Sequence, residues 1–251
     1  MQRNIIASPA EGLTIYNTEN KCLETFIGTG WINLCDGSAL NVTNACDPTS
    51  PTVVVDVVAA GETWMDRNLG ASQAATGSTD FLAYGNLYQW GRGSDGHECI
   101  NWTSSTGSDG DEQTNESAGA SSSTSPGSTF ITGLNNWYSG SESNNLWQGE
   151  TGINNPCPSG YRLPIETELQ ALDDSFAPNN AGGAATSPVK MPVAGYRNRS
   201  NGALGPVGSG GHYWSSKVSG ADARGLRFSS SSSSIGANGR ALGYSVRCLK
   251  D

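Results

Sequence analysis

The closing stretch HYWSSKVSGADARGLRFSSSSSSIGANGRALGYSVRCLKD (residues 212–251) decides how this chain is organised. Both of its ends are rich in aromatic and β-branched residues, which are typical of buried strands. Its middle consists of Ser, Gly, Ala and Arg, which cannot build a core but can line a surface. The pattern predicts a rigid frame around a solvent-facing middle. The residues we expect in that frame are Tyr213, Trp214, Leu226, Phe228, Val246 and Cys248.

Composition limits the class of protein. The chain has 251 residues, which fits one large β-rich domain, or one domain with a small appendage. Its 33 glycines predict many turns. The formal net charge is −9 and no basic track is visible, which argues against nucleic acid and anionic membranes as partners. No stretch is long and apolar enough to span a bilayer, so we expect no membrane insertion.

The six cysteines point to an oxidising destination. They are widely spaced, none forms a C-x-x-C pair, and only two histidines accompany them, so we expect no zinc site. Such cysteines in a Gly- and Ser-rich acidic chain favour disulfides and an extracellular location. Cys22 and Cys35 could staple the N-terminal hairpin, whereas the pairing of Cys46 and Cys99 is left open. The first residues lack the apolar segment of a signal peptide. We therefore expect a removed leader or release by lysis, as for a virion component.

Hydrophobic patterning predicts three regions. Residues 1–36 form an N-terminal attachment segment with a β-hairpin or small meander. Residues 37–52, rich in Pro, Ser, Asp and Asn, form a linker. Residues 53–251 form the main domain.

Within the main domain, strands are expected over 53–58 and 63–65. The low-complexity residues 103–129 predict a long loop. Apolar residues spaced along 165–176 predict one helix, which Pro178 ends. A Gly/Ala loop then precedes a strand over 189–194.

Six ordered blocks of this domain resemble a known family. They are TWMDRNLGAS (63–72), YGNLYQWGR (84–92), NNPCPSGYRLPIETEL (154–169), AGYRNRSNGAL (194–204), HYWSS (212–216) and GYSVRCLKD (243–251). Together they resemble the Fibrobacter succinogenes major paralogous domain. The R-L-P-x-E-x-E run and the closing S-V-R-C are also similar to the formylglycine-generating-enzyme family. Both resemblances imply an α+β, C-type-lectin-like fold with a short twisted antiparallel sheet, one or two helices and long loops.

One departure from the family pattern concerns the helix start. The family places a threonine where this chain has Ile165, and Glu168 follows three residues later. A threonine there would complete a capping box. Isoleucine has no side-chain oxygen, so we expect that cap to be absent or moved.

The resemblance also bears on catalysis. The formylglycine generators act through a reactive cysteine pair near the C-terminus, whereas this chain offers Cys248 alone there. We interpret Cys248 as paired with Cys157 in a structural disulfide, and we expect no enzyme activity. His97 is interpreted as a loop hydrogen-bonder, and Asp173-Asp174 as a solvated helix edge.

C-type-lectin-like folds often bind calcium, so this is the metal to consider. The acidic run Asp109-Gly-Asp111-Glu112 offers hard oxygen ligands, but it lacks the spacing of an EF-hand. The Glu-Pro-Asn tripeptide of calcium-dependent lectins is also absent. We expect no cofactor and no metal, with a structural calcium ion as the open alternative.

Proteins similar to this domain include targets of diversity-generating retroelements, which vary a C-terminal cassette. The resemblance implies a ligand face over 196–242, and a well-hydrated Ser-rich loop is the alternative. Alternation places Arg227 on the solvent side, and we expect Arg224 in the turn before that strand. Tyr, Trp and Arg are the usual anchors of recognition surfaces. The candidate ligand-binding residues are Tyr196, Asn198, Arg199, His212, Trp214, Lys217, Arg224 and Arg227.

These observations predict a non-enzymatic recognition module outside the cell, on a cell surface or virion. It would act as an adhesin or as a receptor-binding protein of a tail fibre, with a protein or glycan on a cell surface as its partner. The N-terminal hairpin would attach it to a larger assembly or mediate self-association. The alternative is a structural secreted subunit with no dedicated ligand.

Overall fold

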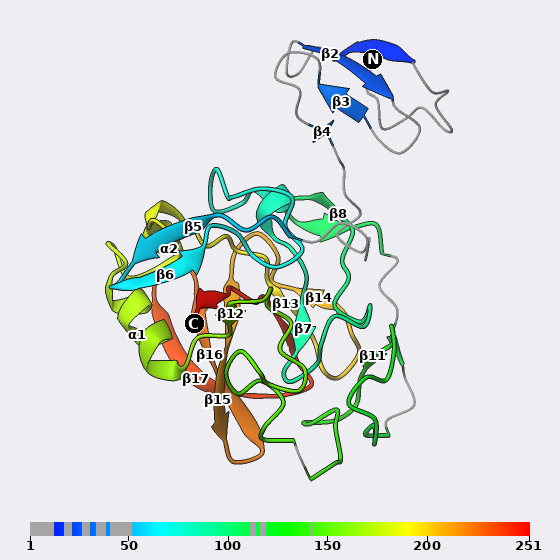
Figure 1. Cartoon of the computed structure of the whole chain (residues 1–251), viewed down its shortest axis with the longest axis vertical. Coiled ribbons are helices and arrows are strands. Elements are labelled where there is room, and N and C mark those ends of the chain that lie inside the picture. The colour runs from blue at the N-terminus through cyan, green and yellow to red at the C-terminus, as the bar shows by residue number, and fades with distance from the viewer. Residues whose placement is uncertain are drawn as a thin grey trace. The chain divides into compact units, whose positions relative to one another are not determined.

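A computed structural model describes residues 13–17, 22–26, 31–33, 39–40, 52–110, 114–115, 119–141 and 143–251. The chain divides into two compact units, residues 1–44 and 45–251. The described part is an α+β structure, rich in short strands, with two α-helices and long connecting loops (Figure 1). None of the helices in these ranges combines the length and apolar character that crossing a membrane requires.

The first unit is a small antiparallel meander. Its strands are β1 (Thr14–Asn17), β2 (Cys22–Phe26), β3 (Trp31–Asn33) and β4 (Ala39–Leu40), paired in chain order. Strand β4 lies inside the range expected to be linker. The proposed Cys22–Cys35 staple and Cys46 lie outside the residues whose side chains are described.

The two ends of the second unit share one antiparallel sheet. Its order is β12 (Tyr161–Arg162), β19 (Leu249–Lys250), β6 (Glu62–Met65) and β5 (Asp56–Ala59). The expected strand over 53–58 begins later, at Asp56, and the valines before it are exposed. The reason is that β5 has a neighbour on one side only, and its pairing with β6 covers Asp56 to Ala59.

The Ser- and Gly-rich middle of the closing stretch forms a sheet rather than a loop. Strands β15 (Gly211–Ser219), β16 (Asp222–Phe228) and β17 (Ser233–Gly239) pair antiparallel in that order. Small residues are poor strand formers by themselves. Here the backbone hydrogen bonds between neighbouring strands keep these residues extended. Strand pairing thus compensates for the weak β propensity of the side chains.

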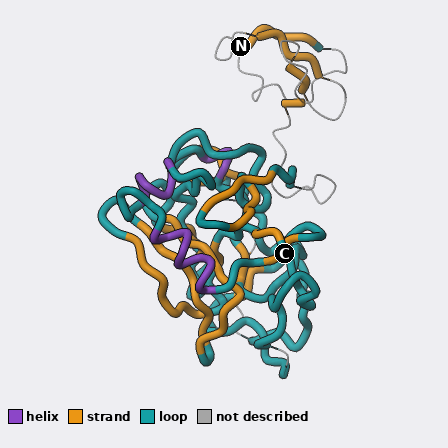
Figure 2. The backbone as a smooth tube through the Cα atoms, turned by 60° about the vertical axis from the view of Figure 1, so that its left-hand side comes forward, coloured by secondary structure: helices purple, strands orange, loops and turns teal. Residues whose placement is uncertain are grey.

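Shorter elements complete the second unit. A four-stranded sheet has the order β14 (Leu204–Gly205), β13 (Tyr196–Arg197), β18 (Gly243–Tyr244) and β7 (Tyr88–Gln89). A 3-10 turn, η2, spans Phe81–Ala83. Two small strand pairs lie in or next to the low-complexity range, β8 (Trp102–Ser104) with β9 (Gly107–Ser108), and β10 (Thr114–Asn115) with β11 (Phe130–Ile131). In Figure 2 loops still account for much of this unit.

One of the two helices covers a face of the three-stranded sheet. Helix α1 (Glu166–Asp174) packs on β15, β16 and β17, and it buries Leu169 and Leu172 completely. Ile165, expected on the same apolar stripe, is instead the N-cap residue and is 46% exposed. Figure 1 shows α1 beside β17.

Helix α2 (Ala181–Thr186) replaces the Gly/Ala loop that we expected. Asn180 caps it, since its Oδ1 accepts hydrogen bonds from the backbone N–H groups of Gly182 (2.9 Å) and Gly183 (3.2 Å). Gly183 is required by space: a Cβ there would lie 1.9 Å from the Pro178 carbonyl oxygen. Asn180 is a favourable N-cap residue in the sequence, but the two glycines that follow it favour a loop over a helix.

The predicted frame of the closing stretch is confirmed. The side chains of Tyr213, Trp214, Leu226, Val246 and Cys248 are completely buried. Tyr213 and Leu226 lie with α1 on one side of the sheet, while Trp214, Val246 and Cys248 join a second cluster on the other side. The Cys157–Cys248 disulfide is also confirmed, and it ties the last strand to the segment before α1.

The start of α1 gives a first prediction. Glu168 accepts the backbone N–H of Ile165 (2.8 Å), so half of a capping box is formed, but no side chain accepts from the first helical turn. Ile165→Thr should therefore raise the free energy of unfolding by about 1 kcal/mol, because little packing is lost from an exposed side chain. Urea denaturation measures the change, with Ile165→Ala as the control. A midpoint for the threonine variant no higher than that of the alanine variant would contradict this assignment.

Candidate functional site

The two faces of the β15–β16–β17 sheet separate the candidate arginines. Arg224 lies within β16, on the same face as Leu226, and its Nε donates to Glu166 Oε1 of α1 at 2.8 Å. The expectation that Arg224 sits in a turn before the strand is wrong, because side-chain alternation begins at the first residue of β16. Arg227 lies on the opposite face and is exposed. The structure therefore does not bring these two side chains together.

A group of aromatic rings lies beside Arg227. His212 on β15 is the register partner of Arg227. The His212 ring lies 4.9 Å from the Tyr196 ring and 5.1 Å from the Tyr244 ring, centroid to centroid. We call Tyr196, His212, Arg227 and Tyr244 the aromatic–arginine patch. Strands β13, β15, β16 and β18 each contribute one of its residues.

Trp214 supports the patch from below and is not at its surface. Its ring is completely buried, stacks on Tyr244 at 4.2 Å and donates through Nε1 to the Tyr88 carbonyl oxygen at 2.8 Å. The prediction that Trp214 contacts the ligand is therefore wrong. Tyr244 itself is 3% exposed, so it shapes the patch more than it contributes surface.

The remaining candidates have other roles. Asn198 Oδ1 accepts the N–H of Ser200 (2.8 Å) and shapes the turn between β13 and β14. Arg199 Nη1 reaches the Leu134 carbonyl oxygen at 3.5 Å. Lys217 is exposed and lies within the irregularity of β15 between Trp214 and Val218. Of the predicted face, the patch thus keeps Tyr196, His212 and Arg227.

Sequence reasoning missed Tyr244, which belongs to the patch, and Gly236, which lies against its arginine. A Cβ at position 236 would lie 2.7 Å from Arg227 Nη2, so the guanidinium extends over this glycine. The sequence gives only a weak signal for Gly236. This residue stands two positions after the serine run, in a segment with several other glycines, so nothing local distinguishes it. Only the register of β16 against β17 shows that Gly236 adjoins Arg227.

Burial sets the charge of His212. Desolvation, and then the positive charge of Arg227, lower the pKa of His212 to about 4, while a hydrogen bond with the Gly195 backbone acts in the opposite direction. The phenol groups of Tyr196 and Tyr244 are the other titratable groups against the ring. The imidazole is therefore neutral at pH 7.

This predicts a loss of stability in acid. The folded pKa lies below the unfolded value of about 6.5, so the contribution of His212 is present above pH 6.5 and is lost as the pH falls toward 4. We expect the wild-type chain to lose about 3 kcal/mol more between pH 7 and pH 4 than His212→Gln does. Urea denaturation at both pH values measures the difference, and equal losses in the two proteins would refute it.

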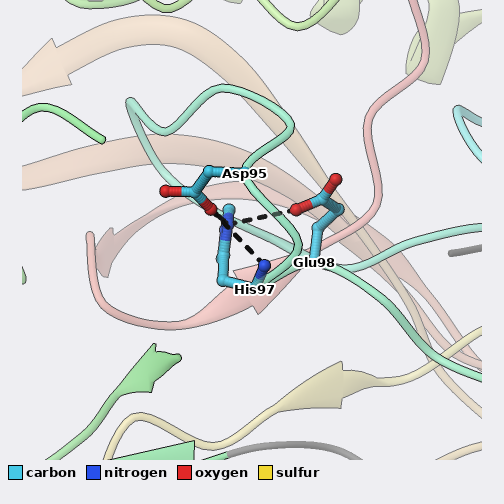
Figure 3. A group of neighbouring side chains, drawn as sticks. All are labelled: Asp95, His97 and Glu98. Carbon is cyan, nitrogen blue, oxygen red and sulfur yellow. Dashed lines mark hydrogen bonds and ion pairs between the residues drawn. The ribbon is translucent and has the colours of Figure 1, made fainter. Parts of the chain in front are cut away.

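A second cluster lies in the loop after β7 (Figure 3). Asp95, His97 and Glu98 each offer a ligand atom, and these atoms lie within 4.8 Å of one another. His97 Nδ1 is 2.6 Å from Asp95 Oδ1 and 3.2 Å from Glu98 Oε2. The three residues fall within four consecutive positions, so the sequence alone indicates that they lie close together. The prediction from sequence concerned His97 only, as a hydrogen-bonding residue of the loop.

The hydrogen bonds of this cluster fit a structural role better than metal binding. His97 Nε2 accepts the backbone N–H of Gln89 at 3.0 Å, so the proton of the neutral ring is on Nδ1, the atom that faces the carboxylates. A metal on Nδ1 would displace that proton. Asp95 also receives two hydrogen bonds from Arg92 Nη2, at 2.8 and 2.9 Å. His97 therefore acts as the loop hydrogen-bonder that we predicted.

The electrostatics of Asp95 agree with this arrangement. Burial alone would raise the pKa of the Asp95 carboxyl, but its hydrogen bonds with His97 and Arg92 and the charge of Arg92 outweigh burial and lower that pKa. The negative charge of the Asp95 carboxylate is thus already stabilised by neighbouring protein groups. The other acidic run considered for calcium, from Asp109 to Glu112, extends outside the described residues.

Comparison with protein-family models, with curated proteins and with solved structures gives no match for this chain.

Proposed function

We propose that this chain is an extracellular recognition module that binds a protein or glycan on a cell surface through the aromatic–arginine patch. The observation that carries the proposal is the exposed Arg227 beside the rings of Tyr196 and His212. Arginine and tyrosine are enriched among the residues that dominate binding energies. The family resemblance and a C-type-lectin-like fold belong to the same proposal, with strands β15 to β17 as the ligand-presenting sheet.

The sheet beneath the patch suits a binding surface because it is fixed from both sides. Helix α1 packs on one face, and Trp214 packs under Tyr244 on the other. The Cys157–Cys248 disulfide anchors the strand that follows Tyr244. Surface side chains on such a frame lose little backbone entropy on binding, which favours affinity.

A non-enzymatic role and an extracellular location are parts of the proposal. Cys248, the cysteine that an enzyme of the formylglycine-generating type would require, is held in the disulfide. A disulfide suits an oxidising compartment. The N-terminal meander is the part that we propose to attach the module to a surface assembly or a virion fibre.

The two arginines on opposite faces provide a matched test. Purified wild-type, Arg227→Ala and Arg224→Ala proteins are compared on a glycan array and on a panel of bacterial cells. Arg227→Ala should weaken binding at least about tenfold, because it removes the cation of the patch. Arg224→Ala removes the same cation from the α1 side and should leave binding unchanged. Its partly exposed pair with Glu166 contributes roughly 0–1 kcal/mol, so this control remains folded.

The proposal fails if the wild-type protein binds no glycan and no cell. It also fails if Arg227→Ala and Arg224→Ala bind equally well, since recognition would then occur elsewhere on the chain.

A further inference from the structure

The patch lies in the basic quarter of an acidic chain. Residues 190–250 contain nine Lys and Arg and one acidic residue, Asp222, a local net charge of +8. The rest of the chain holds the other five of 14 basic and 22 of 23 acidic residues, a net charge of −17. The overall net charge of −9 is therefore the sum of a basic segment, residues 190–250, and an acidic remainder of the chain. Arg224 and Lys250 are paired with Glu166 and Asp56, so the charge that an anionic ligand meets at the patch is that of the exposed Arg227.

Among the arginines that the structure describes, Arg227 differs in having no hydrogen-bond or ion-pair partner within the described part of the protein. Within the described ranges, Arg67, Arg162 and Arg224 pair with carboxylates, and Arg92 pairs with Asp95. Three further guanidinium groups are buried against protein oxygens, those of Arg197, Arg240 and Arg247. Among these same residues, no hydrogen bond or ion pair engages the guanidinium of Arg227. Five N–H donors therefore remain open to a ligand.

The surroundings of this guanidinium limit the shape of the ligand. Gly236 leaves space beneath it, and Ser234, the exposed register partner of Arg227 on β17, places a hydroxyl nearby. The rings of Tyr196 and His212, both partly exposed, meet edge to face on the other side. A planar guanidinium matches a carboxylate with two parallel hydrogen bonds. Aromatic rings pack against the apolar C–H groups of a pyranose.

We propose that the patch binds a carboxylate-bearing saccharide, with the carboxylate on Arg227 and the sugar ring against Tyr196 and His212. This inference rests on the proposed function and names the ligand class for the same site. An acidic peptide could satisfy Arg227, but it would leave the two rings without a matching partner.

The test compares acids with their neutral esters. Trisaccharides ending in galacturonic, glucuronic or N-acetylneuraminic acid, and the methyl ester of each, are titrated into the full chain by calorimetry. A hexaglutamate peptide is the non-saccharide probe. At least one acid should bind at least tenfold more tightly than its ester and than the peptide. Arg227→Ala should abolish the preference for acid over ester, and Arg224→Ala should retain it.

Gly236→Ala tests the placement of the guanidinium. The added methyl group would displace the flexible end of Arg227, so folding should change little while the preference for the acid falls. Thermal denaturation separates this result from unfolding.

The inference is wrong if no acid binds better than its ester, or if the peptide binds as tightly as the acids. Its failure is distinguishable from failure of the proposed function. Array binding of neutral glycans that is lost in Arg227→Ala would keep the recognition role and remove only the acidic ligand.

Discussion

A chain carrying both Cys157→Ala and Cys248→Ala should unfold with a free energy about 4–5 kcal/mol below that of the wild type. The bridge joins residues 91 positions apart, so cutting it releases a long loop in the unfolded chain and raises the entropy of that state. Urea denaturation without reductant measures the difference. Cys248 is completely buried, and the small cavity left by alanine adds to the loss.

Reductant provides the control for this prediction. The wild-type protein with reductant should fall to about the midpoint of the double variant. Any further fall when reductant is added to the double variant reports disulfides among the other cysteines. Equal midpoints for the untreated wild type and the double variant would show that this bridge does not stabilise the fold.

Replacement of Asn68 by alanine should cost about 3–5 kcal/mol, because it leaves a buried charge without its main acceptor. Asn68 Oδ1 accepts from Arg247 Nη2 at 2.7 Å and from Arg247 Nε at 3.1 Å. Its Nδ2 donates to the Tyr84 carbonyl oxygen (3.0 Å) and to the Tyr213 hydroxyl (3.2 Å). Burial lowers the pKa of Arg247 to about 10, which still leaves the guanidinium charged at pH 7.

Asn179→Ala is the matched control, since the same group is removed from an exposed position, and it should cost at most about 0.5 kcal/mol. Asn68→Asp keeps the acceptor for Arg247 but loses the Nδ2 donors, so its stability should lie between those of the wild type and Asn68→Ala. A loss for Asn68→Ala no larger than that for Asn179→Ala would contradict the role of this network.

The parts of the fold that were predictable are those with strong local signals. Tyr213, Trp214 and Leu226 are apolar residues in a polar stretch, and burial is the favourable outcome for them in almost any compact arrangement. The helix over 165–176 had an apolar period and a proline stop, and α1 forms within those limits. The Cys157–Cys248 pair followed from resemblance rather than from spacing.

The parts that were not predictable depend on contacts between distant residues. Strand β17 consists mostly of Ser, Gly and Ala, and only pairing with β16 makes it a strand. Helix α2 contains two adjacent glycines; Asn180 caps its first turn, and the Pro178 carbonyl explains why position 183 holds a glycine, since it leaves no room for a side chain. The Asp95–His97 contact was near in sequence, but the backbone N–H of Gln89 decided the position of the ring proton.

By itself the sequence determined that the frame of the closing stretch is buried and that its polar middle could form a surface, because burial there follows side-chain polarity and short-range periodicity. Only the tertiary structure decided which surface residues meet. Arg224 and Arg227 are three positions apart on one strand, so the pleat directs them to opposite faces. One faces Glu166 of α1, and the other stands beside His212, Tyr196 and Gly236, a grouping that depends on the register of three strands.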